Sequence, residues 1–195
     1  MNNPFVTPSD FQSPQVRVAK IRPVSIVTYP GIEIIDLTGP MEVFAFANNA
    51  LQRSGVCSEP AYPMQVLAAK PGPVMSSCGL QIIADKAYSD VQDGIDTLLI
   101  AGTPEVSCLL CDSALQDWVR TMAPKVRRLA SVCTGAFLLA ESGLLDGRRA
   151  TSHWDYCDWL ARDYPAVNVE ADRIFVRDGF ISTSGGITSG IDMAL

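Results

Sequence analysis

The chain has 195 residues, 48% of them hydrophobic, and a formal net charge of −6 at pH 7. This length fits one globular domain with a sizeable core, and no apolar run is long enough to span a membrane. The cations are scattered apart from KVRR at 125–128, so the chain by itself is a poor candidate for a nucleic-acid-binding protein.

The first 22 residues are predicted to form a flexible N-terminal arm. Pro, Ser and Asn outnumber apolar residues in the segment 1–15, and it lacks the apolar core of a secretory signal. The six cysteines stand at uneven spacing, which is typical of reduced thiols rather than of a disulfide scaffold. These features predict a cytoplasmic location.

Strands and helices alternate along residues 23–195, which indicates one α/β domain with a doubly wound sheet. A β-branched strand at 24–29 leads through a loop, 32–39, into a helix with Pro40 in its first turn. Further strands are predicted at 64–69, 80–84, 96–102, 127–132 and 148–154. Further helices are predicted at 112–123, after Cys133 up to Gly143, and at 155–164. A hairpin that turns on Asp178-Gly179 is predicted at 173–184.

The last segment, GGITSGIDMAL, indicates a glycine-rich turn and the first turns of a helix whose apolar face begins at Ile191. A domain rarely ends two turns into a core-facing helix. We therefore expect this helix to be truncated and more sequence to follow it.

Cys133 stands where the buried strand RRLASV changes into a helical pattern, with the small residues Thr134 and Gly135 next to it. This order is typical of a nucleophile elbow, in which the helix N-terminus lowers the thiol pKa. The backbone N–H groups of Thr134 and of Gly102-Thr103 are candidates for an oxyanion hole. The alternative is a buried, inert cysteine, which is a common feature of protein cores.

Two side chains are candidate partners of the thiol. His153, the only histidine, is predicted at the carboxyl end of a strand, the edge where open α/β sheets place their sites. A lone histidine beside Trp154 is more often structural. Asp36 lies in the first predicted loop and is either a hydrogen-bond partner of the sulfur or a turn aspartate. Glu42 is better interpreted as a charge at a helix N-terminus.

Other motifs are weaker. The segment CLLC at 108–111 has the spacing of a metal or redox pair, but no second pair accompanies it, so we expect no zinc site and no other metal. The loops GTPEV and SGGITSG lack the lysine of a phosphate-binding loop and the full dinucleotide fingerprint. We interpret them as turns and expect no cofactor.

Four segments together resemble the PfpI/ThiJ-like, class I glutamine amidotransferase-like domain found at the N-terminus of AraC-family transcriptional regulators. They are DTLLIAG, the block RRLASVCTGAFLLAESGLLDGRRATSHW, YPAVNVEADRIFVRDG and TSGGITSGIDMAL. The resemblance runs from about Val24 to the end of the chain, and its central block carries the elbow, a glycine turn and the Thr-Ser-His-Trp strand in order.

The resemblance implies a flavodoxin-like sheet, a homodimer, and a ligand pocket around Cys133 flanked by Asp36 and His153, with Gly102, Thr103 and Thr134 among its lining residues. In such regulators the domain senses a small metabolite, often nitrogenous, and a C-terminal pair of helix-turn-helix motifs binds DNA. That DNA-binding part is missing from this sequence, which agrees with its acidic charge.

The same superfamily contains isonitrile hydratase, which the chain resembles at DLTGPMEVF and SVCTG. This resemblance implies an alternative function as a cysteine-dependent hydratase or hydrolase in which Asp36, Cys133 and Thr134 are the active residues. Peptidase-like activity is disfavoured, because Thr134 stands where such relatives have histidine and Asp36 stands in place of glutamate. Thr103 replaces a glycine of many relatives, which alters the oxyanion hole. A third hypothesis is redox sensing by Cys133.

Overall fold

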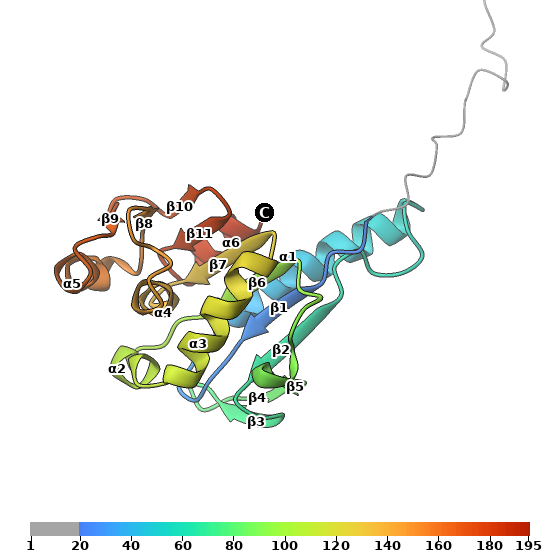
Figure 1. Ribbon diagram of the computed structural model, residues 1–195. Coiled ribbons are helices and arrows are strands. Elements are labelled where there is room, and N and C mark those ends of the chain that lie inside the picture. Colours follow the sequence, from blue (N-terminus) through green and yellow to red (C-terminus); the bar gives the residue numbers. More distant parts are fainter. Residues whose placement is uncertain (1–19) are drawn as a thin grey trace, which may run out of the picture.

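The computed structural model describes residues 20–195, and a seven-stranded sheet lies at its centre (Figure 1). The sheet is formed by β1 (Val24–Val27), β2 (Met64–Ala68), β5 (Lys86–Ala87), β6 (Thr97–Ile100), β7 (Arg128–Val132), β10 (Phe175–Asp178) and β11 (Ile181–Ser184). The spatial order is β10-β11-β7-β6-β1-β2-β5, and all neighbours are parallel except β10 and β11. The predicted mostly parallel α/β sheet is therefore confirmed.

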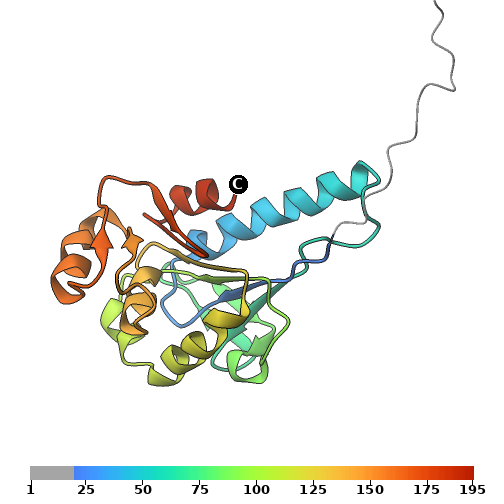
Figure 2. The ribbon, with the colours of Figure 1, turned by 45° about the horizontal axis from the view of Figure 1, so that its top comes forward.

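Helices cover both faces of this sheet. Figure 2 shows α1 (Ile34–Arg53) and α6 (Thr188–Ala194) on one face, and α3 (Ser113–Met122) and α4 (Gly135–Glu141) on the other. Successive residues of β6 alternate between the two cores: Leu98 packs with the α3–α4 cluster and Leu99 with the α1 cluster. This is the flavodoxin-like arrangement expected from the sequence. None of the helices within residues 20–195 has the length and apolar character that a membrane crossing requires.

The first helix begins earlier than the sequence indicates. The segment predicted as a loop, 32–39, is mostly helical, because α1 starts at Ile34 and Pro40 lies inside it. Asp36 therefore lies in the first turn of a helix. Glu42, which was interpreted as a charge at the helix N-terminus, lies well inside α1. Glu33, the N-cap, forms no side-chain hydrogen bond to the helix, so the usual sequence signal for a helix start is missing.

The strand predicted at 148–154 is also shorter than expected. Only β8 (Arg149–Ala150) is extended, and it pairs with β9 (Asn168–Val169) outside the main sheet. A short 3₁₀ turn, Trp154–Tyr156, follows, and then α5 (Cys157–Asp163).

Four strands and helices were not predicted: β3 (Gly72–Met75), which pairs with β4 (Gln81–Ala84), the short strands β5 and β9, and α2 (Val106–Leu110). The predicted hairpin of β10 and β11 is confirmed, but its two turn residues are Gly179 and Phe180, one position later than predicted, because Asp178 pairs with Ile181. Of the predicted arm 1–22, residues 1–19 lie outside the described part of the chain. The last helix, α6, starts at Thr188. This is three residues before Ile191, the residue at which its apolar face was predicted to begin.

Candidate functional site

Cys133 lies in a sharp turn between β7 and α4, at the carboxyl edge of the sheet. Its φ of 56° is in the left-handed region, which a non-glycine residue rarely adopts, and its N–H donates to the carbonyl of Ser184 (2.9 Å). Gly135 permits the tight turn, since a Cβ at this position would lie 2.5 Å from the carbonyl oxygen of Ile100. The residue is 8% exposed, so the thiol is displayed by a strained elbow but is largely buried.

Asp36 reaches the same place from α1. Its carboxyl group is fully buried and accepts two backbone hydrogen bonds, from Gly102 N–H to Oδ2 (3.2 Å) and from Ile187 N–H to Oδ1 (2.7 Å). A Cβ added at Gly102 would lie 2.6 Å from Asp36 Oδ2 and 2.7 Å from Cys133 Cβ. The glycine at the end of β6 thus allows the carboxyl group and the elbow to meet.

This meeting point is a switch point of the sheet. β1 and β6 are neighbours, but the chain leaves β1 toward β2 on the opposite side. Open α/β sheets bind ligands at the carboxyl ends of strands next to such a reversal. Asp36 follows β1, Gly102 follows β6, and Cys133 follows β7, so three strand ends contribute to one site.

Hydrogen bonds between Thr134 and Thr103 join the elbow to the loop that follows β6, here called the β6 loop. The Thr134 Oγ1 accepts the N–H of Thr103 (2.7 Å) and donates to its carbonyl oxygen (2.6 Å), and both side chains are buried. The N–H groups of Gly102 and Thr103 are therefore already bonded, to Asp36 and Thr134. The oxyanion hole predicted from them is not formed in this arrangement, because both N–H groups already have acceptors.

Burial dominates the electrostatics of the site. It raises the pKa of Asp36 from 3.8 to about 6, although the hydrogen bonds from Ile187 and Gly102 act in the opposite direction. Burial, followed by the negative charge of Asp36, raises the pKa of Cys133 from 9.0 to about 12. The expectation that the helix N-terminus lowers the thiol pKa is thus wrong: desolvation and a neighbouring carboxylate outweigh a helix of seven residues. At neutral pH the thiol holds its proton beside an ionised Asp36.

A second strained segment, which sequence analysis missed, closes over the sulfur. Gly186 has φ 100°, and a Cβ there would lie 2.8 Å from Cys133 Sγ. The next residue, Ile187, has φ 49° and precedes α6. A β-branched residue in this region is a genuine outlier, so no sequence signal could have identified it.

Tyr29 was also missed. Its hydroxyl donates to the carbonyl oxygen of Ala101, which links the end of β1 to the β6 loop. Burial, followed by the charges of Asp36 and Cys133, raises the pKa of Tyr29 well above its usual value of 10.0. The tyrosine therefore lies near both groups, and it remains neutral.

His153 lies at the start of the turn that precedes α5. Its Nδ1 accepts the N–H of Asp155 (3.3 Å), and its ring packs beside Trp154 and Tyr156. The neighbouring Ser152 donates to the carbonyl oxygen of Cys133 (3.0 Å), whereas the hydrogen bond of the His153 side chain is made within its own turn. Its part in ligand binding stays a prediction.

The CLLC pair lies apart from this site. Cys108 and Cys111 are exposed and unpaired, at the end of α2. Residues 20–195 contain no group of three or more His, Cys, Asp or Glu side chains arranged to hold a metal ion.

The sequence of the chain matches a known protein family. Residues 22–195 match the model of the DJ-1/PfpI family. An isonitrile hydratase of Pseudomonas putida is 37% identical over 172 residues, which cover 88% of this chain and 68% of the relative. The HTH-type transcriptional regulator CdhR of Pseudomonas aeruginosa is 32% identical over 166 residues, or 85% of this chain, and the match spans 46% of that regulator.

A solved structure has the same fold. The ThiJ/PfpI family protein from Pseudomonas syringae superimposes with a TM-score of 0.78 at 25% identity, covering 99% of this chain and 73% of that protein.

Proposed function

The chain belongs to the DJ-1/PfpI family, and from this premise we propose that it is the ligand-sensing domain of an AraC-type transcriptional regulator, with a small nitrogenous molecule bound at Asp36 and Cys133. The match to a regulator of which it spans about half supports this role. In this proposal DNA is bound by a separate C-terminal domain, since the domain itself carries a net charge of −6. A homodimer and a cytoplasmic location belong to the same proposal.

One observation carries the proposal: a single carboxylate joins the loop after β6, which lies beside the elbow, to the segment that leads into α6. Asp36 accepts the N–H of Ile187 with one oxygen and the N–H of Gly102 with the other. Cys133 and Ile187 are the two non-glycine residues with positive φ in the described part of the chain. Such strain costs about 1–3 kcal/mol per residue and persists only where neighbours enforce it, commonly at binding sites and switches.

A ligand that hydrogen-bonds to Asp36 competes with these backbone donors. A carboxylate accepts hydrogen bonds and attracts positive charge, so ammonium, amide or amidine N–H groups complement it. If the ligand takes the Oδ1 position, the N–H of Ile187 loses its acceptor and the strained turn relaxes. α6 follows directly, and it packs on α1 through Gly39, where a Cβ would lie 2.8 Å from Ile191 Cγ1. Binding at the elbow is thereby coupled to the end of the domain.

The second candidate function is hydration of an isonitrile, supported by the 37% identity to isonitrile hydratase and by the position of Asp36 against the thiol. In this scheme the S–H of Cys133 adds across the terminal carbon of R–NC, forming an S–C bond and a thioformimidate, R–N=CH–S–Cys. Asp36 carries the proton from sulfur to carbon. Water then adds to that carbon, the C–S bond breaks, and the formamide R–NH–CHO leaves with the thiol restored.

Thermal unfolding in the presence of defined probes separates the two functions. Acetamide, methylammonium chloride and an alkyl isonitrile are added to the wild-type chain, Asp36→Ala and Cys133→Ser. The sensor predicts that at least one nitrogenous probe raises the Tm of the wild type only, and that NMR detects no formamide. Formation of formamide that requires Cys133 supports the hydratase. Equal Tm shifts in all three proteins, or no shift with any probe, contradict binding of a nitrogenous ligand at this site.

A further inference from the structure

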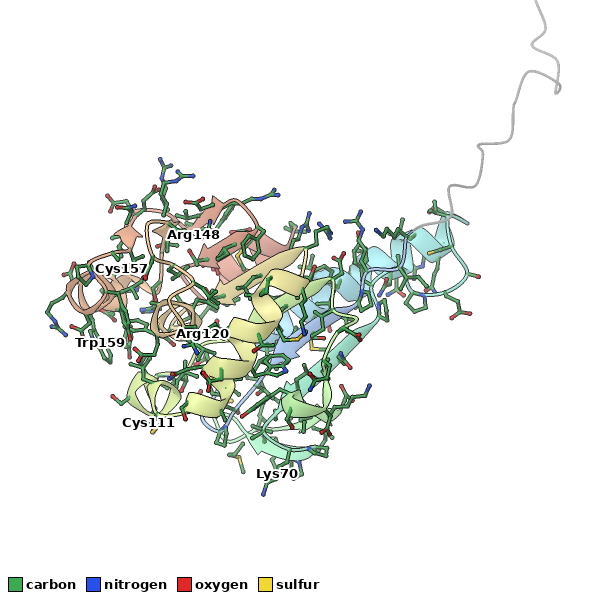
Figure 3. All side chains as sticks on the ribbon, viewed as in Figure 1. Lys70, Cys111, Arg120, Arg148, Cys157 and Trp159 are labelled. Carbon is green, nitrogen blue, oxygen red and sulfur yellow. The ribbon has the colours of Figure 1, made fainter. Side chains whose placement is uncertain are left out.

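Two exposed cysteines on α2 are not used by the site around Cys133. Cys108 lies in the last turn of this helix, and Cys111 is the residue that follows it. Both are exposed and unpaired. Figure 3 labels Cys111 on the outer side of α2, at the surface of the molecule. Small solutes therefore have access to both sulfur atoms.

The backbone places the two residues within reach of a disulfide. The N–H of Cys111 donates to the carbonyl oxygen of Cys108 (3.3 Å), so one helical turn separates them. The rise and radius of a helix put Cα atoms three residues apart at about 5 Å. Disulfides span about 4.4–6.8 Å between Cα atoms.

The Cβ atoms require a small adjustment. On a regular helix they are roughly 5–6 Å apart, and a disulfide needs about 4 Å. Because Cys111 lies beyond the last residue of a five-residue helix, its backbone can tighten without breaking a long run of helical hydrogen bonds.

The surroundings give the two thiols different roles. Cys108 donates its S–H to Glu105 Oε2 (3.6 Å), and this hydrogen bond to a carboxylate raises the pKa of Cys108. The thiol that attacks first is therefore Cys111, which has no such partner.

We propose that Cys108 and Cys111 are a reversible thiol–disulfide pair whose oxidant is a small-molecule disulfide such as oxidised glutathione. The thiolate of Cys111 attacks one glutathione sulfur, an S–S bond forms to Cys111, and one reduced glutathione leaves. The thiolate of Cys108 then attacks the sulfur of Cys111 and expels the second glutathione. Two protein thiols are oxidised and one glutathione disulfide is reduced to two thiols, so atoms and electrons balance.

Closure alters the connection between α2 and the elbow. It removes the S–H that Cys108 donates to Glu105, whose own N–H donates to Thr103 Oγ1 (3.1 Å). Thr103 is in turn bonded to Thr134. The pair is thus connected through Glu105 to the loop that holds the elbow.

Peptide mass spectrometry tests the pair directly. The chain is equilibrated with mixtures of reduced and oxidised glutathione, quenched in acid, alkylated and digested with trypsin. The peptide 87–120 contains Cys108 and Cys111 and no other cysteine. We expect it to lose the mass of two hydrogen atoms, to escape alkylation, and to recover both thiols when reduced glutathione is added.

Variants separate closure from simple surface reactivity. Cys108→Ser and Cys111→Ser are each expected to trap a mixed disulfide with glutathione on the remaining thiol. Cys78, another exposed cysteine, is the internal reference, and Cys78→Ser should close the pair as the wild type does. The proposal is overturned if peptide 87–120 carries glutathione without closing. It is equally overturned if both thiols remain free in mixtures that already modify Cys78, or if Cys78 is one of the paired residues.

Discussion

The Oδ1 atom of Asp36 accepts the N–H of Ile187 at 2.7 Å, although 151 positions separate the two residues in the chain. This hydrogen bond joins the first helix to the last, and both ends of it are unusual. Asp36 is a fully buried carboxyl group, and Ile187 is a β-branched residue with positive φ.

The pKa of Asp36 predicts a pH-dependent stability. Folding raises this pKa from 3.8 to about 6, so the folded state binds the proton more tightly than the unfolded chain. The stabilisation is fully present below pH 4 and is lost as the pH rises to about 6, which amounts to roughly 3 kcal/mol. Chemical denaturation of the wild type and Asp36→Asn at several pH values measures it. The free energy of unfolding of the wild type should fall relative to the variant across this window; a constant difference would contradict the raised pKa.

The thiol of Cys133 should react slowly with alkylating reagents at neutral pH. Because its pKa is about 12, the rate should keep rising through pH 9 without a plateau. Asp36→Asn removes the charge that contributes to this shift, so it should speed alkylation of Cys133 at a given pH. Cys78, exposed and with a lowered pKa, serves as the reference thiol in the same sample. A plateau for Cys133 near neutral pH would contradict this account of the site.

Gly186→Ala should destabilise the protein more than a glycine substitution in open space. The new Cβ would lie 2.8 Å from the sulfur of Cys133, in addition to the strain of φ 100°. Gly94→Ala is the matched control, because Gly94 has φ 79° and no atom within 4 Å of such a Cβ. The control should cost about 1–2 kcal/mol for the backbone alone. Crowding at Gly186 should add about 1–3 kcal/mol. Equal losses would show that Gly186 does not press on the thiol.

Thr134→Val should loosen the contact between the elbow and the β6 loop. It leaves the buried N–H and carbonyl groups of Thr103 without partners, which costs about 1–3 kcal/mol for each unsatisfied group. Thr121→Val provides a control, since the Thr121 hydroxyl donates to the backbone carbonyl oxygen of Asp117 at an exposed position on α3. Urea denaturation should show a loss of at least 1 kcal/mol for Thr134→Val relative to this control. Comparable stabilities would refute the role of Thr134 in joining the elbow to the β6 loop.

The sheet and the position of the elbow could be predicted from the sequence because both depend on local patterns. Apolar runs of four to six residues mark β1, β6 and β7, and the change of periodicity at Cys133 marks the turn. The start of α1 could not be predicted, since Ile34, Ile35 and the pair Gly39-Pro40 resemble a loop. Tertiary contacts stabilise that turn instead: Leu37 is buried, and Asp36 is bonded to two distant backbone groups.

Local sequence patterns could not predict the protonation state of Cys133 either. The position of Cys133 before a helix suggested a lowered pKa, but the thiol is buried and faces Asp36, a contact that depends on how β1, β6 and β7 meet. Ile187 carries no signal at all, since nothing in the sequence indicates positive φ at an isoleucine. Local patterns indicated Cys133, Asp36 and Thr134, but the three-dimensional arrangement determines their protonation and their partners.

Hydrogen exchange over residues 185–195 tests the coupling between the elbow and α6 most directly. Iodoacetamide at alkaline pH attaches a carboxamidomethyl group to Cys133, which must displace the segment at Gly186, because even a Cβ there would lie 2.8 Å from the sulfur. Cys133→Ser treated in the same way controls for modification of the other cysteines. We predict that amide exchange at Ile187 and in α6 becomes faster when Cys133 is modified and does not change in the treated variant. Equal exchange in both proteins would contradict the claim that occupancy of this site is transmitted to the last helix.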